Sequence, residues 1–498
     1  STESGLMANS GSKLVPNVYV PRQTKIVATL GPASTDPAVL ERMIAAGMNV
    51  VRVNFSHGTA QEHIDRVKTV REIAARLKRD IAVMADLQGP KIRIGVFANG
   101  STNLVNGQPF VLEAKCDSGD DERVGLDYPE LVNDVKTGDT LLLDDGKIVL
   151  KVKKVTPSQI HCETEVGGVL KNRKGINKLG GGLSAPALTS KDMEDIRTAV
   201  AFEADYIAVS FPKSGADMYM ARELTRAAGG HAMMIAKIER CEALENLDDL
   251  IRSCDGLMVA RGDLAVEIGD AAVPAAQKRL IRAAREANKL TITATQMMES
   301  MIESPVPTRA EVSDVANAVL DGTDAVMLSA ETAAGKFPVE TIVAMARVCV
   351  EAEKSATISL DTDFLNRKFK RVDQSIAMAA LFTAHHLEVK AIAALTQSGS
   401  TALWMSRLNS GVPIFALTPE EKTRRRLSMY RDVRTVMMQY ETEDREVLLA
   451  KSEQALLDAK VVELGDLIVI TIGEPIGKSG GTNTMKIVRV GEHIGLLN

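Results

Sequence analysis

Several residue types that stabilise small secreted or membrane-embedded proteins are scarce in this sequence. Its 498 residues include five cysteines, scattered without a Cys-x-x-Cys pair, so we expect neither a disulfide framework nor a zinc site. No run of about 18 apolar residues occurs, which argues against a membrane-spanning helix. The first 20 residues lack the cationic start and apolar run of a signal peptide, so a reducing, cytoplasmic location fits best.

A large charge of one sign is also missing. Lys and Arg number 60 against 65 Asp and Glu, so the formal net charge of -5 offers no overall field for nucleic acid or an anionic membrane. The basic stretch EKTRRRLSMYR from Glu421 is a local exception, but aromatic residues make up only 3% of the chain. We therefore interpret this stretch as a solvated helix face or a subunit contact rather than an RNA site.

The sequence does contain a repeated alternation of apolar runs and amphipathic helical stretches. Near-continuous apolar runs indicate strands that are buried on both faces, as in a parallel sheet. Eight such units predict an α/β fold of the (β/α)8 TIM barrel type, although a doubly wound open sheet has the same local pattern. The runs begin at Thr24, Asn49, Ile81, Asp205, Ala232, Asp255, Leu290 and Thr323.

Two changes of pattern divide the chain into domains. DTLLLDDGKIVLKVKKV, from Asp139, alternates polar and apolar residues around an Asp-Gly turn, which predicts a small β-barrel lid over residues 90–186. The catalytic TIM barrel would then comprise residues 21–89 and 187–353. Helices and strands alternate anew after Glu353, predicting a separate C-terminal α/β domain over residues 354–498. Residues 1–20 form an N-terminal extension, which we interpret in part as an expression remnant.

Polar residues that follow the predicted strands should meet at one mouth of the barrel. Lys237 and Glu239 lie two apart in IAKIER and therefore point to the same side of a strand. Asp263 follows the next strand, in MVARGDLAVEI, and would face Glu239. Two carboxylates coexist when they share a cation or a proton, and two oxygen ligands with room for water and substrate suit Mg2+, with Mn2+ as an alternative. A core ion pair is the structural alternative for Lys237.

Other strand ends add groups that suit an anionic substrate. Arg52 and Arg93 are candidate phosphate ligands, and Lys237 is a fixed positive charge. Thr295 ends a strand in TITATQMMESM and precedes a predicted helix, so it is either a hydroxyl relay, an N-cap or both. This set suits a phosphorylated enol whose enolate is held and then protonated. The residues alone thus predict a metal-dependent enolate enzyme, with an aldolase or lyase, or a non-catalytic regulatory paralogue, as alternatives.

Several motifs occur in the same order as in a known family. They are KIVATLGPAS, NVVRVNFSHG, GDLAVEI after MVAR, ATQMMESM, PTRAEVSDVANAVLDGTDAVMLSAET and GTNTMKIVRV. With these motifs the chain resembles pyruvate kinases along nearly its whole length after residue 20.

The resemblance implies transfer of phosphoryl from phosphoenolpyruvate to ADP, giving ATP and pyruvate in the final step of glycolysis. The reaction would pass through a Mg2+-stabilised enolate that is then protonated, in a homotetramer. Motif by motif, the resemblance assigns catalysis to Arg52, Arg93, Lys237, Thr295 and Glu331, substrate binding to Arg52, Lys237, Gly262, Asp263 and Thr295, nucleotide binding to Asn54, His57, Arg93 and Lys174, and Mg2+ binding to Glu239 and Asp263.

Two glycine-containing loops in the C-terminal part resemble phosphate sites. In AALTQSGSTALWMSRL a strand leads through Ser398, Gly399, Ser400 and Thr401 into a helix, an arrangement that cradles phosphate or is a plain capped turn. The resemblance implies a phosphorylated sugar or nucleotide effector there. GEPIGKS, from Gly473, lacks the spacing of a P-loop and predicts a glycine-rich loop between the last two strands.

The stretch ADLQGPKIRIG, from Ala85, departs from the common pattern of the family. Many pyruvate kinases read Asp-Thr-Lys-Gly-Pro-Glu there and bind K+ through residues that match Asn54, Ser56, Asp86 and the carbonyl of Leu87. Here Lys91 stands in place of the Glu, which resembles the branch of the family that works without K+. A tethered ammonium supplies the unit charge of K+, so we expect K+ not to be required. Neutral drift to Lys is the alternative.

Overall fold

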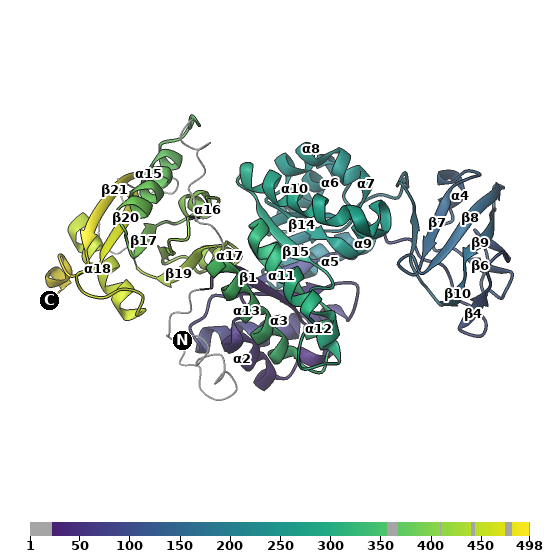
Figure 1. Cartoon of the computed structure of the whole chain (residues 1–498), viewed down its shortest axis with the longest axis horizontal. Coiled ribbons are helices and arrows are strands. Elements are labelled where there is room, and N and C mark those ends of the chain that lie inside the picture. Colours follow the sequence, from purple (N-terminus) through teal and green to yellow (C-terminus); the bar gives the residue numbers. More distant parts are fainter. Residues whose placement is uncertain (1–21, 356–366, 409, 440–443, 474–480, 498) are drawn as a thin grey trace.

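The computed structural model describes residues 22–355, 367–408, 410–439, 444–473 and 481–497. The N-terminal extension of residues 1–20 and residues 474–479 of the GEPIGKS loop lie outside the described residues. Three units follow one another along the long axis of the molecule: a barrel in the centre, a small β unit on one side and an α/β unit on the other (Figure 1). Within the described ranges no helix is long and apolar enough to cross a membrane.

The central unit is a closed barrel of eight parallel strands, so the TIM barrel is confirmed and the open sheet is excluded. Every hydrogen-bonded neighbour pair is parallel, and the first strand pairs with the last. Most strand residues are fully buried because helices cover the outside and side chains fill the inside. The strands are β1 (Lys25–Thr29), β2 (Val50–Asn54), β3 (Ala82–Asp86), β12 (Tyr206–Val209), β13 (Met233–Ile238), β14 (Gly256–Ala260), β15 (Leu290–Ala294) and β16 (Ala325–Leu328).

Helices surround the barrel, and their starts follow local capping rules. Thr59, Thr189 and Thr308 each accept a hydrogen bond from the backbone three residues later, as N-cap residues do. The helices are α2 (Pro37–Ala46), α3 (Ala60–Arg76), α5 (Ser190–Ala201), α6 (Gly215–Ala227), α7 (Cys241–Glu245), α8 (Leu247–Ser253), α9 (Arg261–Ile268), α10 (Val273–Glu286), α11 (Arg309–Asp321), α12 (Ala330–Ala333) and α13 (Pro338–Ser355), with short 3-10 turns at Pro32–Ser34, Asp270–Ala272 and Glu299–Ile302.

The insert after β3 is a curled β unit, which we call the lid. A six-stranded sheet has β11 and β6 at its edges, and both edges reach the segment that leads in from the barrel. Arg93 bridges Gly175 beside β11, and Ile94 bridges Leu126 beside β6, so isolated bridges close the expected small barrel. Its elements are β4 (Ser101–Leu104), β5 (Pro109–Glu113), β6 (Arg123–Gly125), α4 (Leu131–Asp134), β7 (Thr140–Leu143), β8 (Ile148–Val155), β9 (Gln159–Val166), β10 (Gly168–Lys171) and β11 (Ile176–Lys178).

The C-terminal unit is an α/β domain, as the alternation predicted. Its sheet has the order β19-β18-β17-β20-β21, parallel except for the last strand. The elements are α15 (Val372–His386), β17 (Ala391–Leu395), α16 (Ser400–Ser406), β18 (Ile414–Thr418), α17 (Glu421–Leu427), β19 (Val433–Met437), α18 (Arg445–Asp458), β20 (Leu467–Gly473), β21 (Thr482–Arg489) and a 3-10 turn at Ile494–Leu497.

The basic stretch from Glu421 is in part buried against the barrel of the same chain. Arg425 is 7% exposed and its Nε donates to Asp205 at 3.1 Å, and Arg424 pairs with Asp80 at 3.2 Å. Both aspartates lie at the lower end of the TIM barrel, before β12 and β3. The expected solvated helix face is therefore wrong, because carboxylates of the same chain neutralise these arginines across the domain boundary.

Candidate active site at the barrel mouth

The centre of the site is a buried carboxylate, Asp86, at the upper end of β3. Arg52, which lies on β2, donates from Nε to Asp86 Oδ2 at 2.7 Å. Lys237, which lies on β13, places Nζ 3.0 Å from Asp86 Oδ1 and 3.1 Å from Ser210 Oγ. Barrel closure thus brings two predicted catalytic cations, Arg52 and Lys237, to the same carboxylate. Lys237 is the one at the mouth of the barrel.

The charged forms of Asp86 and Lys237 stabilise each other. Burial raises the pKa of Asp86, but Lys237 and Arg52 outweigh it and hold that pKa below its ordinary value. Burial lowers the pKa of Lys237, but Asp86 and Glu239 more than compensate, so the ammonium is retained at neutral pH. With Arg52 and Lys237 against Asp86, the cluster carries a net positive charge that suits a phosphate group.

Glu239 and Asp263, the two carboxylates predicted to bind a metal, lie close enough to influence each other's ionisation. Glu239 is 2% exposed, and burial together with the nearby Asp263 carboxylate raises its pKa to about 8 despite Lys237. Two facing carboxylates that resist joint ionisation share either a proton or a cation, so the pair fits a divalent metal. In the described part of the chain no three His, Cys, Asp or Glu side chains group as metal ligands. The remaining ligands would come from water and substrate, as Mg2+ accepts.

Thr295 occupies a strained position just above β15. Its φ of 72° is left-handed, which is uncommon for a β-branched residue, and Gln296 follows with φ 56°. Arg261 holds this turn by donating to the carbonyl oxygens of Ala294 at 3.2 Å and Thr295 at 2.6 Å. The strain is maintained at the hydroxyl that the sequence predicted to act in catalysis.

The sequence predicted a helix directly after Thr295, but none begins there. The helix whose N-terminus lies beside Thr295 is α9. Thr295 Oγ1 accepts the backbone N–H of Gly262 at 2.8 Å, in the first turn of α9. The left-handed turn ends β15 without starting a helix, and a short 3-10 turn begins only at Glu299. The anion-attracting N–H groups near Thr295 therefore come from the first turn of α9, which directly follows β14.

Glu331 lies one layer behind these groups. Its carboxylate accepts the backbone N–H of Ser329 at 2.9 Å and that of Met298 at 3.1 Å. It is 2% exposed, and burial raises its pKa. These contacts tie the loop after β16 to the loop that carries Thr295.

Comparison with known proteins decides the family. A family model described as pyruvate kinase, barrel domain, matches residues 21–342, and one described as pyruvate kinase, alpha/beta domain, matches residues 374–488. Pyruvate kinase II of Salmonella typhimurium is 52% identical over 475 residues, which cover 94% of this chain and 99% of that protein. The chain belongs to the pyruvate kinase family.

Other relatives agree with this result. The pyruvate kinase of Haemophilus influenzae is 50% identical over 458 residues, 91% of this chain and 96% of that protein. The pyruvate kinase of Staphylococcus aureus strain MRSA252 is 41% identical over 479 residues, 95% of this chain and 81% of that protein. The family implies phosphoenolpyruvate and ADP as substrates and a requirement for a divalent metal. The prediction of a pyruvate kinase is confirmed.

Two predicted pyruvate kinase site residues, Arg93 and Lys174, belong to the lid segment rather than to the cluster around Asp86. The Arg93 guanidinium donates to the carbonyl oxygen of Arg173 at 3.2 Å, and Lys174 Nζ lies 3.6 Å from Asp144. Among the contacts of the described residues, none joins either cation to Arg52 or Lys237. The computed structure therefore does not bring these two residues to the centre of the site.

Of the residues predicted to hold K+ in other pyruvate kinases, Asn54, Asp86 and Leu87 have their oxygens engaged, whereas Ser56 is exposed. Asn54 Oδ1 accepts the backbone N–H of Ser56 at 3.0 Å, and the carbonyl of Leu87 accepts Ser210 Oγ at 2.6 Å. His57, the predicted nucleotide contact, is exposed beside them. Within the described ranges no contact joins Lys91 to these groups.

Lys91 instead lines a cleft between the lid and the barrel. Asp263 and Glu267 line the same cleft from the barrel side, and Gly175 borders the Lys91 side chain. A Cβ at Gly175 would lie 2.7 Å from Lys91 Cε, so the end of the lysine side chain packs directly against this glycine.

The predicted effector loop adopts a tight turn at the start of α16. Gly399 has φ 85° and donates to Thr396 Oγ1 at 2.9 Å, while the Ser398 and Ser400 hydroxyls lie 3.0 Å apart. Thr401 is directed elsewhere, to Thr482 Oγ1 at 2.9 Å on β21.

Two contributors to the pyruvate kinase site, Ser210 and Arg261, were strand-end candidates in the sequence to which no role was assigned. Ser210 accepts Lys237 and thereby helps to fix it, and Arg261 holds the strained turn at Thr295. Both directly follow buried strands of the barrel, which was the available signal. Their partners could not be read from the sequence because those partners lie on other strands.

Proposed function

We propose that the cluster of Lys237, Asp86 and Arg52, beside Glu239 and Asp263, performs phosphoryl transfer from phosphoenolpyruvate to ADP. The observation that carries this proposal is a permanently charged lysine, 11% exposed, held by Asp86 next to two facing carboxylates. A fixed cation at a buried site stabilises charge that develops on the transferred group without reorganisation during the reaction.

In this mechanism the side chains act mainly by position. Arg52 and Lys237 bind the transferring phosphoryl group, and Lys237 also faces the enolate oxygen that is left behind. Glu239 and Asp263 would hold Mg2+, or Mn2+ as an alternative, which supplies positive charge to the phosphate and the enolate when bound.

Protonation of the enolate would involve Thr295. Its Oγ1 already accepts the Gly262 N–H at 2.8 Å, so the hydroxyl proton is directed toward another acceptor. The backbone N–H of Asp263, in the first turn of α9, would hold the substrate carboxylate, joined by that of Gly262 when it exchanges Thr295 Oγ1 for the substrate. Glu331 acts through the loop that it binds and is a positioning residue.

The lid would complete the nucleotide side of the site. We assign Arg93 and Lys174 to the bound phosphates after lid closure, with Asn54 and His57 at the rim, because closure also excludes water from the reacting groups. We propose that the chain comprises a catalytic barrel of residues 21–89 and 187–353, a lid of 90–186 and a regulatory domain of 354–498. We further propose that the enzyme is a cytoplasmic homotetramer.

A pyruvate release assay tests this function. We expect pyruvate to form from phosphoenolpyruvate only when both ADP and Mg2+ are present, with one ATP formed for each pyruvate. Release of pyruvate without ADP would instead indicate an aldolase or lyase. Omission of Mg2+ is the matched control, and full activity without any divalent cation would contradict the assignment of Glu239 and Asp263.

We further propose that Lys91 replaces K+ in this enzyme. Its ammonium has no hydrogen bond or ion pair among the described residues, and Lys91 lines the same cleft as Asp263 and Glu267. The oxygens that would otherwise bind K+, from Asn54, Asp86 and Leu87, already accept protein hydrogen bonds. A K+ ion would therefore gain little binding free energy at these oxygens. A tethered ammonium supplies the same charge without the free-energy cost of binding an ion from solution.

We also propose a phosphorylated sugar or nucleotide effector at Ser398, Gly399, Ser400 and Thr401. Support comes from the left-handed glycine and from the two serine hydroxyls, 3.0 Å apart, at the start of α16. Titration of sugar phosphates and of AMP at subsaturating phosphoenolpyruvate should lower the half-saturating substrate concentration about 5-fold or more for one of them. Ser400→Ala should abolish that response, with Ser304→Ala, on the exposed barrel surface, as the control. An unchanged response in Ser400→Ala would contradict this location.

A further inference from the structure

The lower end of the barrel contains the same polar contact four times. The residue just before every second strand accepts a backbone N–H near the start of the preceding strand, and we call each contact a clip. The clips join Asn49 Oδ1 to Ile26 N at 2.9 Å, Asp205 Oδ2 to Val83 N at 2.8 Å, Asp255 Oδ2 to Met234 N at 2.8 Å, and Asp324 Oδ2 to Thr291 N at 2.9 Å.

An arginine binds each of the four clip residues. Arg22 and Arg222, which bind Asn49 and Asp255, come from the segment before β1 and from α6 of the barrel. Arg425 and Arg407, which bind Asp205 and Asp324, come from the C-terminal domain. Docking of that domain therefore completes two of the four clips.

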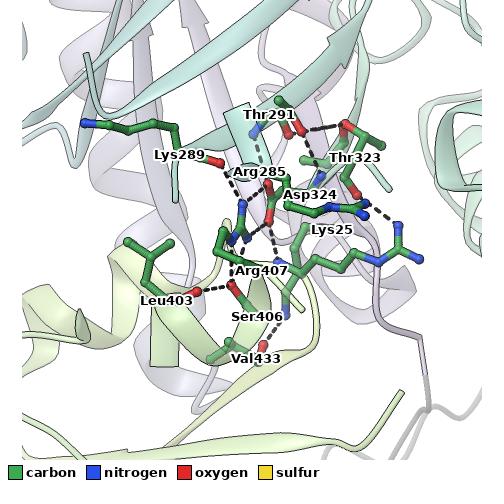
Figure 2. Close-up of polar contacts among 12 residues, drawn as sticks. Lys25, Arg285, Lys289, Thr291, Thr323, Asp324, Leu403, Ser406, Arg407 and Val433 are labelled. Atoms are coloured by element: carbon green, nitrogen blue, oxygen red, sulfur yellow. Dashed lines mark hydrogen bonds and ion pairs between the residues drawn. The ribbon is translucent and has the colours of Figure 1, made fainter. Parts of the chain in front are cut away.

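Of the four clip residues, Asp324 accepts the most hydrogen bonds. Its carboxylate accepts Thr291 N, Arg431 N at 3.0 Å, Arg407 Nη1 at 2.8 Å and also Arg407 Nη2 (Figure 2). A carboxylate offers about four acceptor positions, so all of them are occupied. Three of the four donors belong to the C-terminal domain.

Arg407 is likewise buried and bonded through several of its guanidinium N–H groups. It is 3% exposed, and besides Asp324 it donates to the Lys289 carbonyl at 2.7 Å and to Ser406 Oγ at 2.8 Å from Nη2 (Figure 2). Lys289 directly precedes β15, so Arg407 binds the lower ends of both β15 and β16. Arg407 follows α16 directly, and the opposite end of that seven-residue helix is Ser400.

The ladder between the two strands that Arg407 binds is short, and Thr323 supplements it below by bonding to Thr293 Oγ1 at 3.0 Å and to the Thr291 carbonyl at 3.3 Å. β15 and β16 share two paired residue positions, Ile292 with Ala325 and Thr293 with Val326, whereas β14 and β15 share five. Above this short ladder, Glu331 of the β16 side accepts Met298 N beyond β15. A carboxylate thus fixes the spacing of the two strands at either end, and Thr295 lies at the upper end.

We propose that Arg407, acting through Asp324, is a positioning residue that sets the spacing of β15 and β16 and hence the placement of Thr295. The C-terminal domain thereby holds one particular wall of the active site rather than the barrel as a whole. This inference rests on the proposed role of Thr295 in enolate protonation. A shift of α16 would be passed directly to this wall, because Arg407 caps that helix.

Arg407→Met and Arg424→Met test the proposal as a matched pair. Both remove an ion pair between the domains, but Asp80, the partner of Arg424, binds groups of the C-terminal domain and clips no barrel strand. Two rates are measured: ATP formation in a single turnover, and exchange of the methyl protons of pyruvate with deuterium from solvent. We expect Arg407→Met to slow exchange about 10-fold with ATP formation changed less than about 3-fold, and Arg424→Met to change neither more than about 3-fold.

Two further variants keep the outcome decisive. Asp324→Asn/Arg407→Met leaves no unpaired buried charge and replaces Arg407→Met if that variant does not fold. Thr295→Val tests the role of Thr295 separately: if it leaves exchange unchanged, the proposed protonation role fails. If Thr295→Val slows exchange but Arg407→Met does not, or if Arg424→Met slows it equally, the positioning role of Arg407 is overturned.

Discussion

Lys237→Met is expected to lower turnover of phosphoenolpyruvate by about 10³-fold or more. Methionine retains most of the side-chain stem but removes the ammonium that lies 3.0 Å from Asp86 and 3.1 Å from Ser210. Asp86 keeps Arg52 as a partner at 2.7 Å, so the barrel should remain folded. The loss falls on the transition state, because the developing charge no longer has a fixed cation beside it.

Three measurements distinguish this loss from misfolding. Steady-state turnover gives the main effect, a Mn2+ titration reports on Glu239 and Asp263, and the thermal unfolding midpoint reports on the fold. We expect metal affinity within about 5-fold of the wild type, since neither proposed metal ligand is altered. Lys289→Met is the matched control, because that partly buried lysine lies at the lower end of the barrel and binds the Cys254 carbonyl. Turnover within about 10-fold of the wild type in Lys237→Met would overturn the mechanism.

Lys91→Glu is expected to make the enzyme dependent on K+. In a tetramethylammonium buffer without K+ the wild type should be fully active, whereas the variant should lose about 100-fold and recover largely on addition of K+. The substitution replaces a positive by a negative charge in the cleft that also contains Asp263 and Glu267. A monovalent cation would then have an acidic partner that the wild type lacks.

The control for this experiment reverses a lid charge elsewhere. Lys171, at the end of β10, is exposed, so Lys171→Glu changes the net charge of the lid by the same amount. We expect it to leave K+ dependence unchanged, because exposed charges are screened by solvent and salt. Strong K+ activation of the wild type, or no activation of Lys91→Glu, would refute the role of Lys91.

Which residues become strands could be read from the sequence because burial on both faces leaves a local mark. The run from Asn49 predicted β2 (Val50–Asn54), and the run from Ala232 predicted β13 (Met233–Ile238). The same pattern located Arg52, Lys237 and Thr295 at strand ends, where side chains reach the barrel mouth. Family membership also followed from local motifs, and the comparisons confirm it.

The sequence alone did not reveal which of these residues share a partner. Lys237 and Arg52 meet on Asp86 across 151 and 34 residues of chain, because closure of the barrel brings β2, β3 and β13 around one mouth. The short extent of the β15–β16 ladder and the left-handed turn at Thr295 likewise have no local signal.

In the basic stretch from Glu421, composition and the folded structure indicate different surroundings for the arginines. Its composition suggested a solvated or intersubunit surface, yet Arg425 is buried against Asp205, 220 residues away in sequence. Arg407 and Asp324 meet in the same way across 83 residues. Local periodicity determines which segments are buried, since burial acts on each strand separately. Docking of one domain on another decides which charges pair, because an ion pair depends on distances that exist only in the folded chain.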